Sequence, residues 1–223
     1  MDILNADTTE QFVRSAVAWI TAVIHESVAA RGKAVIGLSG GSTPKPVYTM
    51  LATDQHIPWH LVTFFLTDER YVPPTHPDSN QHMVRSTLLT REAKNAVLIA
   101  PRTELLLEKC VTDFGADIQK LGAPDLVILG MGDDGHIVSL FPPVPPEAFG
   151  PAAALHTQTE VFAVKDRITV TFPTLLHAKK RLFLIGGEKK RALLKKMQDT
   201  NEDVSLYPAQ YLFDEKTTWM IAP

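Results

Sequence analysis

The chain has 223 residues, of which 45% are hydrophobic and 21% are charged, enough apolar material for one large α/β domain. Its formal net charge of −3 provides no basic field, so neither nucleic acid nor an anionic membrane is an expected partner. The single cysteine, Cys110, excludes an internal disulfide, fits a reducing compartment and is expected to be a buried apolar side chain. We expect residues 1–223 to form a single domain, with the proline-rich residues 142–151 as a rigid surface loop.

The N-terminal segment has the pattern of an amphipathic helix. Thr8 and Gln11 form a plausible capping box at its start. Apolar side chains then recur at helical spacing, at Val13, Val17, Ile20, Ile24 and Val28. No cationic segment typical of an export signal is evident, and the apolar run at residues 16–24 is too short to cross a bilayer. We therefore expect a cytoplasmic protein with no membrane partner.

Strands and helices alternate through the rest of the chain. Apolar runs predict strands or edge segments at residues 34–36, 61–66, 97–99, 126–129, 161–164, 168–172, 181–185 and 219–221. Helices are predicted at residues 44–51, 78–89 and 104–120, and from residue 188 onward. This alternation favours an α/β fold with a mainly parallel sheet covered by helices on both faces.

The first candidate ligand loop is Gly37-Leu38-Ser39-Gly40-Gly41-Ser42-Thr43-Pro44, which follows a predicted strand. Gly40 and Gly41 let backbone N–H groups approach a ligand closely, and Ser42 and Thr43 add hydroxyl donors. Pro44 suits the first turn of a helix, whose N-terminus favours an anion. The loop therefore predicts a phosphate cradle, although it lacks the Gly-Lys-Ser/Thr ending of a Walker A loop. The alternative is a strand-to-helix turn without a ligand.

The same loop also matches the G-x-S-x-G pattern of serine hydrolases, with Ser39 in the nucleophile position. A nucleophile elbow needs a helix immediately after the serine. Here two glycines intervene and Pro44 delays the helix, so a phosphate cradle is the favoured interpretation.

Asp68, Glu69 and Arg70 follow the strand predicted at residues 61–66. They could form a solvated charge cluster, but the planar guanidinium of Arg70 is well suited to a phosphate. The strand end also places these residues beside the glycine-rich loop. We include Arg70 and Asp68 in the predicted substrate site and leave the separate roles of the two acids open.

The third loop, Gly130-Met131-Gly132-Asp133-Asp134-Gly135-His136, follows the strand predicted at residues 126–129. Open α/β sheets bind ligands at such strand ends. The loop matches the G-x-G-x-x-G dinucleotide fingerprint, but Asp133 and Asp134 would repel a pyrophosphate. Histidine is suited to general base chemistry at neutral pH, and Asp134 is close enough in sequence to orient its ring. We therefore predict a catalytic pair of His136 and Asp134.

The fourth strand end is Gly186-Gly187-Glu188-Lys189-Lys190, which enters a predicted helix. Lysines in a first helical turn oppose the helix dipole, so at least one is expected to face an anion. The alternative is a solvated basic face. The 8 histidines include no H-E-x-x-H motif and no zinc-type spacing, and we predict neither a metal nor a cofactor.

Taken in order, these segments resemble the 6-phosphogluconolactonase family over nearly the whole chain. The matching segments are Ser39-Gly40-Gly41-Ser42-Thr43-Pro44, Thr67-Asp68-Glu69-Arg70 with Val72-Pro73, Asp78-Ser79-Asn80, residues 130–136 with Ser139-Leu140-Phe141-Pro142, Arg167-Ile168-Thr169 and Gly187-Glu188-Lys189-Lys190. The related glucosamine-6-phosphate deaminases share the fold and the Asp-Gly-His element, but a tyrosine normally takes the place of Arg70. The chain departs from the family at Ile137-Val138, where Thr-Ala is common.

The resemblance implies a three-layer fold similar to that of glucosamine-6-phosphate deaminase, and hydrolysis of 6-phospho-D-glucono-1,5-lactone to 6-phospho-D-gluconate. His136 would activate the attacking water and Asp134 would orient the imidazole. The 6-phosphate would be held by Gly40, Gly41, Ser42, Thr43, Arg70 and Lys190, with Arg167 as a further contact. Alignment through Gly187-Glu188 favours Lys190 over Lys189. The expected partner is a small phosphosugar lactone, bound by a monomer or small homo-oligomer.

Three other functions stay open at this point. A glucosamine-6-phosphate deaminase or isomerase would release ammonia from its substrate. A serine hydrolase would be labelled at Ser39 by a fluorophosphonate. A non-catalytic sugar-phosphate sensor would bind 6-phosphogluconate without accelerating loss of the lactone.

Overall fold

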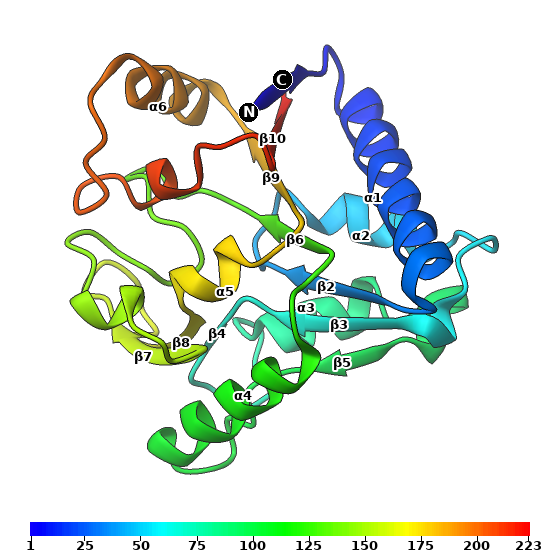
Figure 1. The fold of residues 1–223 in the computed structure, drawn as a ribbon, viewed down its shortest axis with the longest axis horizontal. Helices are drawn as coiled ribbons and strands as arrows, with labels where there is room; N and C mark the ends of the chain where they lie inside the picture. The colour runs from blue at the N-terminus through cyan, green and yellow to red at the C-terminus, as the bar shows by residue number, and fades with distance from the viewer.

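The computed structural model describes residues 1–223 and contains two β-sheets (Figure 1). The strands are β1 (Asp2–Asn5), β2 (Ala34–Leu38), β3 (Val62–Leu66), β4 (Asp68–Arg70), β5 (Val97–Ile99), β6 (Leu126–Leu129), β7 (Ala154–Gln158), β8 (Asp166–Val170), β9 (Lys180–Gly186) and β10 (Thr217–Ala222). Seven of them form a parallel sheet in the order β1-β10-β9-β6-β2-β3-β5. The other three form a small antiparallel sheet in the order β4-β8-β7.

Helices connect the strands of the large sheet. The α-helices are α1 (Thr9–Arg31), α2 (Lys45–Leu51), α3 (Asn80–Thr87), α4 (Leu107–Leu121), α5 (Phe172–Leu176) and α6 (Glu188–Asp199). Short 3₁₀ helices lie at Trp59–Leu61, Arg91–Asn95, Pro146–Phe149 and Pro208–Leu212. No helix combines the length and the apolar character that crossing a membrane would require.

The capping box predicted at the start of α1 is formed in part, because the Gln11 side chain accepts from the Asp7 N–H at 2.8 Å in place of the Thr8 N–H. The Thr8 hydroxyl accepts a hydrogen bond from the Gln11 backbone N–H at 3.1 Å. The helix ends at Gly32, whose φ of 71° is left-handed and whose N–H donates to the Val28 carbonyl. Hydrogen bonds thus satisfy backbone groups at both ends of this helix.

Two apolar cores lie on opposite faces of the large sheet. Along β6, Leu126 and Ile128 join one core, whereas Val127 and Leu129 join the other. The first core is covered by α1, α2 and α3, and the second by α4, α5, α6 and the small sheet. Figure 1 shows α1 and α2 on one side of the central strands and α5 and α6 on the other. Because side chains of a strand alternate between faces, this pattern requires the three-layer α/β/α arrangement that was predicted.

The strand predicted at residues 161–164 is wrong, because this segment is a loop between β7 and β8. Its apolar side chains do not enter either core, and Val161 and Phe162 are exposed. The strand before the loop, β7, has no continuous apolar run and was not predicted. Two further unpredicted strands, β1 and β4, are short and rich in polar residues. Periodicity alone could not identify strands whose pairing is decided by partners elsewhere in the chain.

The strand order places the ends of four neighbouring strands around one point. From β2 the chain proceeds to β3 and β5 in one direction, and then returns to build β6, β9 and β10 in the other. The carboxyl ends of β2 and β6 therefore flank a topological switch point, where open α/β sheets leave a crevice. The loops that follow β2, β3, β6 and β9 are the four segments that the sequence suggested.

An ion pair between a fully buried arginine and a partly exposed aspartate links β9 to the segment before β10 and yields a stability prediction. Arg181 is fully buried on β9, and its Nη2 donates to both carboxylate oxygens of Asp214. Burial acts to raise the pKa of Asp214, but the hydrogen bonds from Arg181 and from the Lys216 N–H outweigh it and lower that pKa. The ionised carboxylate therefore stabilises the fold at pH values above its ordinary pKa of 3.8. This stability is lost as the pH falls through the lower pKa that Asp214 has in the folded protein.

We expect Asp214→Ala to lower the free energy of unfolding by about 3 kcal/mol, because it leaves a buried guanidinium without its counter-charge. Denaturant unfolding at pH 7 measures the change. The matched control is Asp199→Ala, which removes the exposed Lys195–Asp199 pair and is expected to cost no more than about 1 kcal/mol. Equal losses in the two variants would contradict the assigned role of the Arg181–Asp214 pair.

Candidate active site

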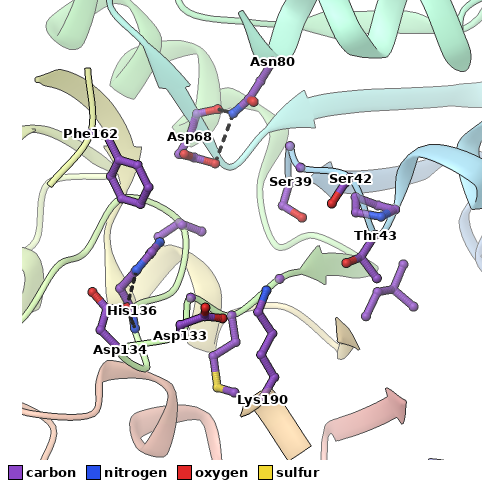
Figure 2. Close-up of a pocket in the computed structure, with 18 of the residues that line it drawn as sticks. Ser39, Ser42, Thr43, Asp68, Asn80, Asp133, Asp134, His136, Phe162 and Lys190 are labelled. Carbon is purple, nitrogen blue, oxygen red and sulfur yellow. Dashed lines mark hydrogen bonds and ion pairs between the residues drawn. The ribbon is translucent and has the colours of Figure 1, made fainter. Parts of the chain in front are cut away.

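A cavity of about 660 Å³ opens at the carboxyl ends of β2, β3, β6 and β9. Its wall is formed by residues 39–44, by the loop at residues 130–136, and by side chains from β4, α3, α6 and the β7–β8 loop. Figure 2 shows the labelled lining residues pointing toward a shared space from these different elements. The cavity therefore brings together segments that are far apart in the sequence.

His136 and Asp134 form a close pair on one side of the cavity. The His136 Nδ1 lies 2.5 Å from Asp134 Oδ1, which also accepts the His136 backbone N–H at 3.1 Å. Burial acts to raise the pKa of Asp134, but the hydrogen bond and charge of His136 outweigh it and lower that pKa. An ionised Asp134 accepts from an Nδ1–H, and a neutral imidazole in that tautomer has its lone pair on Nε2.

The backbone of this loop leaves little space around the imidazole. A Cβ at Gly132 would lie 2.1 Å from His136 Nδ1, so only glycine fits beside the pair. The Gly132 N–H donates to the His136 carbonyl at 2.8 Å, which closes the loop. Two residues further on, Val138 has a φ of 48°, a strained value for a β-branched side chain. The loop is therefore built to fix the histidine in one position.

Asp68 lines the cavity, and its carboxylate is held on two sides. Oδ2 accepts a hydrogen bond from the Ser139 hydroxyl at 2.7 Å. The Asn80 amide donates to the Asp68 carbonyl at 2.9 Å and approaches Oδ1 at 3.4 Å. The same amide fits against Gly40, where a Cβ would lie 1.9 Å from Asn80 Oδ1. Asp68, Asn80 and the glycine-rich loop thus form one connected wall.

Glu69, by contrast, turns away from the cavity and caps α3. Its carboxylate accepts from the backbone N–H groups of Arg70, Asn80 and Gln81 at 2.7–2.8 Å and from the Ser79 hydroxyl at 3.0 Å. Burial raises the pKa of this carboxyl, and the four hydrogen bonds oppose the rise. The two acids that the sequence left undecided therefore have different positions, Asp68 in the cavity wall and Glu69 at a helix end.

Arg70 also lines the cavity, on β4 beside Arg167 of β8. Its Nη1 donates to the Asp78 carbonyl at 2.6 Å, while its buried Nε has no hydrogen-bond partner. A buried, unpaired N–H costs free energy, and an acceptor on a bound ligand could satisfy this one.

Arg167 does not line the cavity. It is 5% exposed, and its Nε donates to the Val164 carbonyl at 3.0 Å. Burial and the nearby charge of Arg70 lower its pKa. Its guanidinium lies over the ring of Phe162, 5.4 Å from the ring centre, and this phenylalanine does line the cavity. The predicted contact between Arg167 and substrate stays a prediction.

The glycine-rich loop and Lys190 form the other side of the cavity. Residues 39–44 all line it, and Ser39 is buried with a hydroxyl that has no hydrogen-bond partner. No base therefore activates Ser39, which gives no support to a serine nucleophile. At the start of α6, Lys190 lines the cavity whereas Lys189 is exposed outside it. The choice of Lys190 as the phosphate-binding lysine stays a prediction.

Every residue predicted for the site except Arg167 lines this one cavity. The lining residues that the sequence reasoning did not assign include Asn80, Asp133, Val138 and Phe162. Asn80 had a signal, because it belongs to the Asp78-Ser79-Asn80 segment of the family resemblance. Phe162 had none, since an apolar run in an edge position predicts a strand and not a cavity wall. No group of three or more histidine, cysteine or acidic side chains is arranged to hold a metal.

A parallel α/β sheet with a histidine–carboxylate pair in a polar cavity at its carboxyl edge defines an enzyme that acts on small molecules. The chain belongs to the glucosamine-6-phosphate isomerase/6-phosphogluconolactonase family, whose model matches residues 7–220.

Similar proteins support this assignment over the full length of the chain. A Dictyostelium discoideum protein named "Probable 6-phosphogluconolactonase" is 38% identical over 217 residues, covering 94% of this chain and 92% of the relative. The 6-phosphogluconolactonase of a Synechocystis strain is 34% identical, covering 90% of this chain and 86% of the relative. The crystal structure of the Thermotoga maritima 6-phosphogluconolactonase superposes with a TM-score of 0.89 at 30% identity, covering 100% and 99% of the two chains. A monomeric glucosamine-6-phosphate deaminase, with a TM-score of 0.86 at 22% identity, shares the fold.

Proposed function

We propose that the protein hydrolyses 6-phospho-D-glucono-1,5-lactone to 6-phospho-D-gluconate, as a 6-phosphogluconolactonase. The main support for the proposal is that the imidazole and the hydroxyl-bearing loop lie on opposite sides of the cavity. His136 lies on one side, while Ser42 and Thr43 lie on the opposite side (Figure 2). The cavity thus has a basic imidazole at one end and anion-binding groups at the other, which suits a substrate with a reactive ester and a remote phosphate.

His136 acts as the general base. Its free Nε2 takes a proton from a water molecule, whose oxygen attacks the lactone carbonyl carbon and forms a tetrahedral intermediate. The bond between that carbon and the ring oxygen then breaks, and the imidazolium returns its proton to the departing oxygen. Asp134 holds the ring in the required tautomer and stabilises the imidazolium. Because a δ-lactone is an activated ester, the reaction needs no covalent nucleophile.

The substrate phosphate is held by Arg70, Lys190 and the residues Gly40, Gly41, Ser42 and Thr43. Two cations and a set of backbone and hydroxyl donors match the charge and the acceptors of a phosphate. The Asp68 carboxylate would repel the phosphate, so it faces the sugar hydroxyls instead. Holding the phosphate at a fixed distance places the lactone carbonyl beside the water, which is positional catalysis.

The test is lactone hydrolysis with substrate generated in the cuvette and spontaneous opening subtracted. Turnover of the phosphorylated lactone, with much slower turnover of unphosphorylated gluconolactone, supports the proposal. Glucosamine 6-phosphate is tested in parallel for ammonia release. Ammonia without lactone turnover would favour a deaminase, and binding of 6-phosphogluconate without any turnover would favour a sensor.

A further inference from the structure

The loop between β7 and β8 carries a phenylalanine to the mouth of the cavity. The Phe162 side chain is 43% exposed, yet it lines the cavity. Its ring is edge-on to the His136 imidazole, with 6.0 Å between ring centres, and lies 5.9 Å from the Phe141 ring. Figure 2 shows the Phe162 ring beside His136, on the side away from Asp134. The Phe141 ring centre is 4.7 Å from that of the imidazole, so the three rings form one triangular cluster.

The loop is held in this position by contacts within the protein. The Thr159 N–H donates to the Lys165 carbonyl at 3.1 Å, which closes the base of the loop. The buried Arg167 donates from Nε to the Val164 carbonyl and places its guanidinium over the Phe162 ring. A cation over the face of an aromatic ring is attractive, most of all when the cation is shielded from water. The buried Arg167 side chain therefore holds the exposed Phe162 ring in position.

We infer that Phe162 is a further substrate-binding residue, which packs on the carbon face of the bound lactone and covers His136. The inference rests on the proposed lactone hydrolysis and extends it to a residue that polar chemistry does not identify. A lactone ring presents C–H groups on its faces, and an aromatic ring is a good apolar partner for them. The same ring restricts access of bulk water to the imidazole, so that the attacking water is one held within the site.

The first test is kinetic. Phe162→Ala is expected to lower kcat/KM for the phosphorylated lactone about tenfold, the effect of losing one aromatic packing contact. Phe162→Leu, which keeps apolar bulk, is expected to recover most of the loss. The matched control is Phe149→Ala, because Phe149 is 42% exposed and packs on Phe172 and Tyr211, outside the cavity. The control is expected to keep wild-type kcat/KM, and thermal unfolding verifies that all variants are folded.

The second test does not depend on activity. Diethyl pyrocarbonate acylates unprotonated imidazoles, and peptide mass spectrometry reports the rate at His136 alone in the free protein. Phe162→Ala is expected to speed acylation of His136, whereas Phe162→Leu and Phe149→Ala leave it at the wild-type rate. The inference requires both the kinetic loss and the faster acylation, and either one without the other overturns it. A wild-type protein without lactone turnover would instead refute the proposed function, while the acylation rates would still show whether Phe162 covers the histidine.

Discussion

His136→Ala is expected to lower kcat for the phosphorylated lactone by about 10²–10⁴-fold, the usual contribution of a general base. His136 is the one histidine that lines the cavity, and its ring is held by the 2.5 Å contact between Nδ1 and Asp134 Oδ1. The substitution removes the proposed proton acceptor and leaves the proposed phosphate-binding groups on the opposite wall. KM is therefore expected to change little, because those groups bind substrate and transition state alike.

A second histidine provides the control for this experiment. His156 on β7 also contacts an aspartate, with its Nε2 2.8 Å from Asp166 Oδ1, but the pair lies outside the cavity. His156→Ala is expected to keep the wild-type kcat. Steady-state rates, corrected for spontaneous opening, measure both variants. Near-normal kcat in His136→Ala would show that another group activates the water.

The large sheet was predictable because its central strands carry their signal in their own residues. The run Leu126-Val127-Ile128-Leu129 is apolar on both sides and is followed at once by glycine, so strand and loop are both defined locally. The small sheet has no such signal. Its strand β4 is Asp-Glu-Arg, which becomes a strand only because it pairs with Thr169, Ile168 and Arg167, far along the chain. Local sequence cannot encode a partner at that separation.

The candidate site was predictable where a residue's chemistry is unusual for its local position. His136 beside two acids, and lysines at a helix start, both suggested function before any geometry was known. The role of Glu69 could not be predicted, because no sequence signal distinguishes it from the adjacent Asp68. Its role depends on the N–H groups of Asn80 and Gln81, which only the fold brings close. Phe162 is the opposite case, because its apolar character suggested a strand and its position at the cavity emerged only from the fold.

Lys190→Ala is expected to lower kcat/KM for the phosphorylated lactone by about 10–150-fold, mainly through KM. A hydrogen bond to a charged group contributes about 1.5–3 kcal/mol, and this free energy corresponds to the expected fold-change in kcat/KM. Unphosphorylated gluconolactone lacks the charged phosphate, so its slow turnover is expected to be nearly the same in wild type and variant. The ratio between the two substrates therefore isolates the phosphate contact from any general loss of activity.

The adjacent Lys189 provides a matched control for Lys190→Ala. Lys189 has the same charge and lies in the same first turn of α6, but it is exposed and does not line the cavity. Lys189→Ala removes the same formal charge from the same helix end, so it reproduces any long-range effect on the anionic substrate. Under the proposal, the two variants differ only in the direct contact between Lys190 and the phosphate. Equal losses of kcat/KM in the two variants would mean that the basic helix acts through its overall electrostatic field. A loss confined to Lys189→Ala would mean that Lys189, and not Lys190, binds the phosphate.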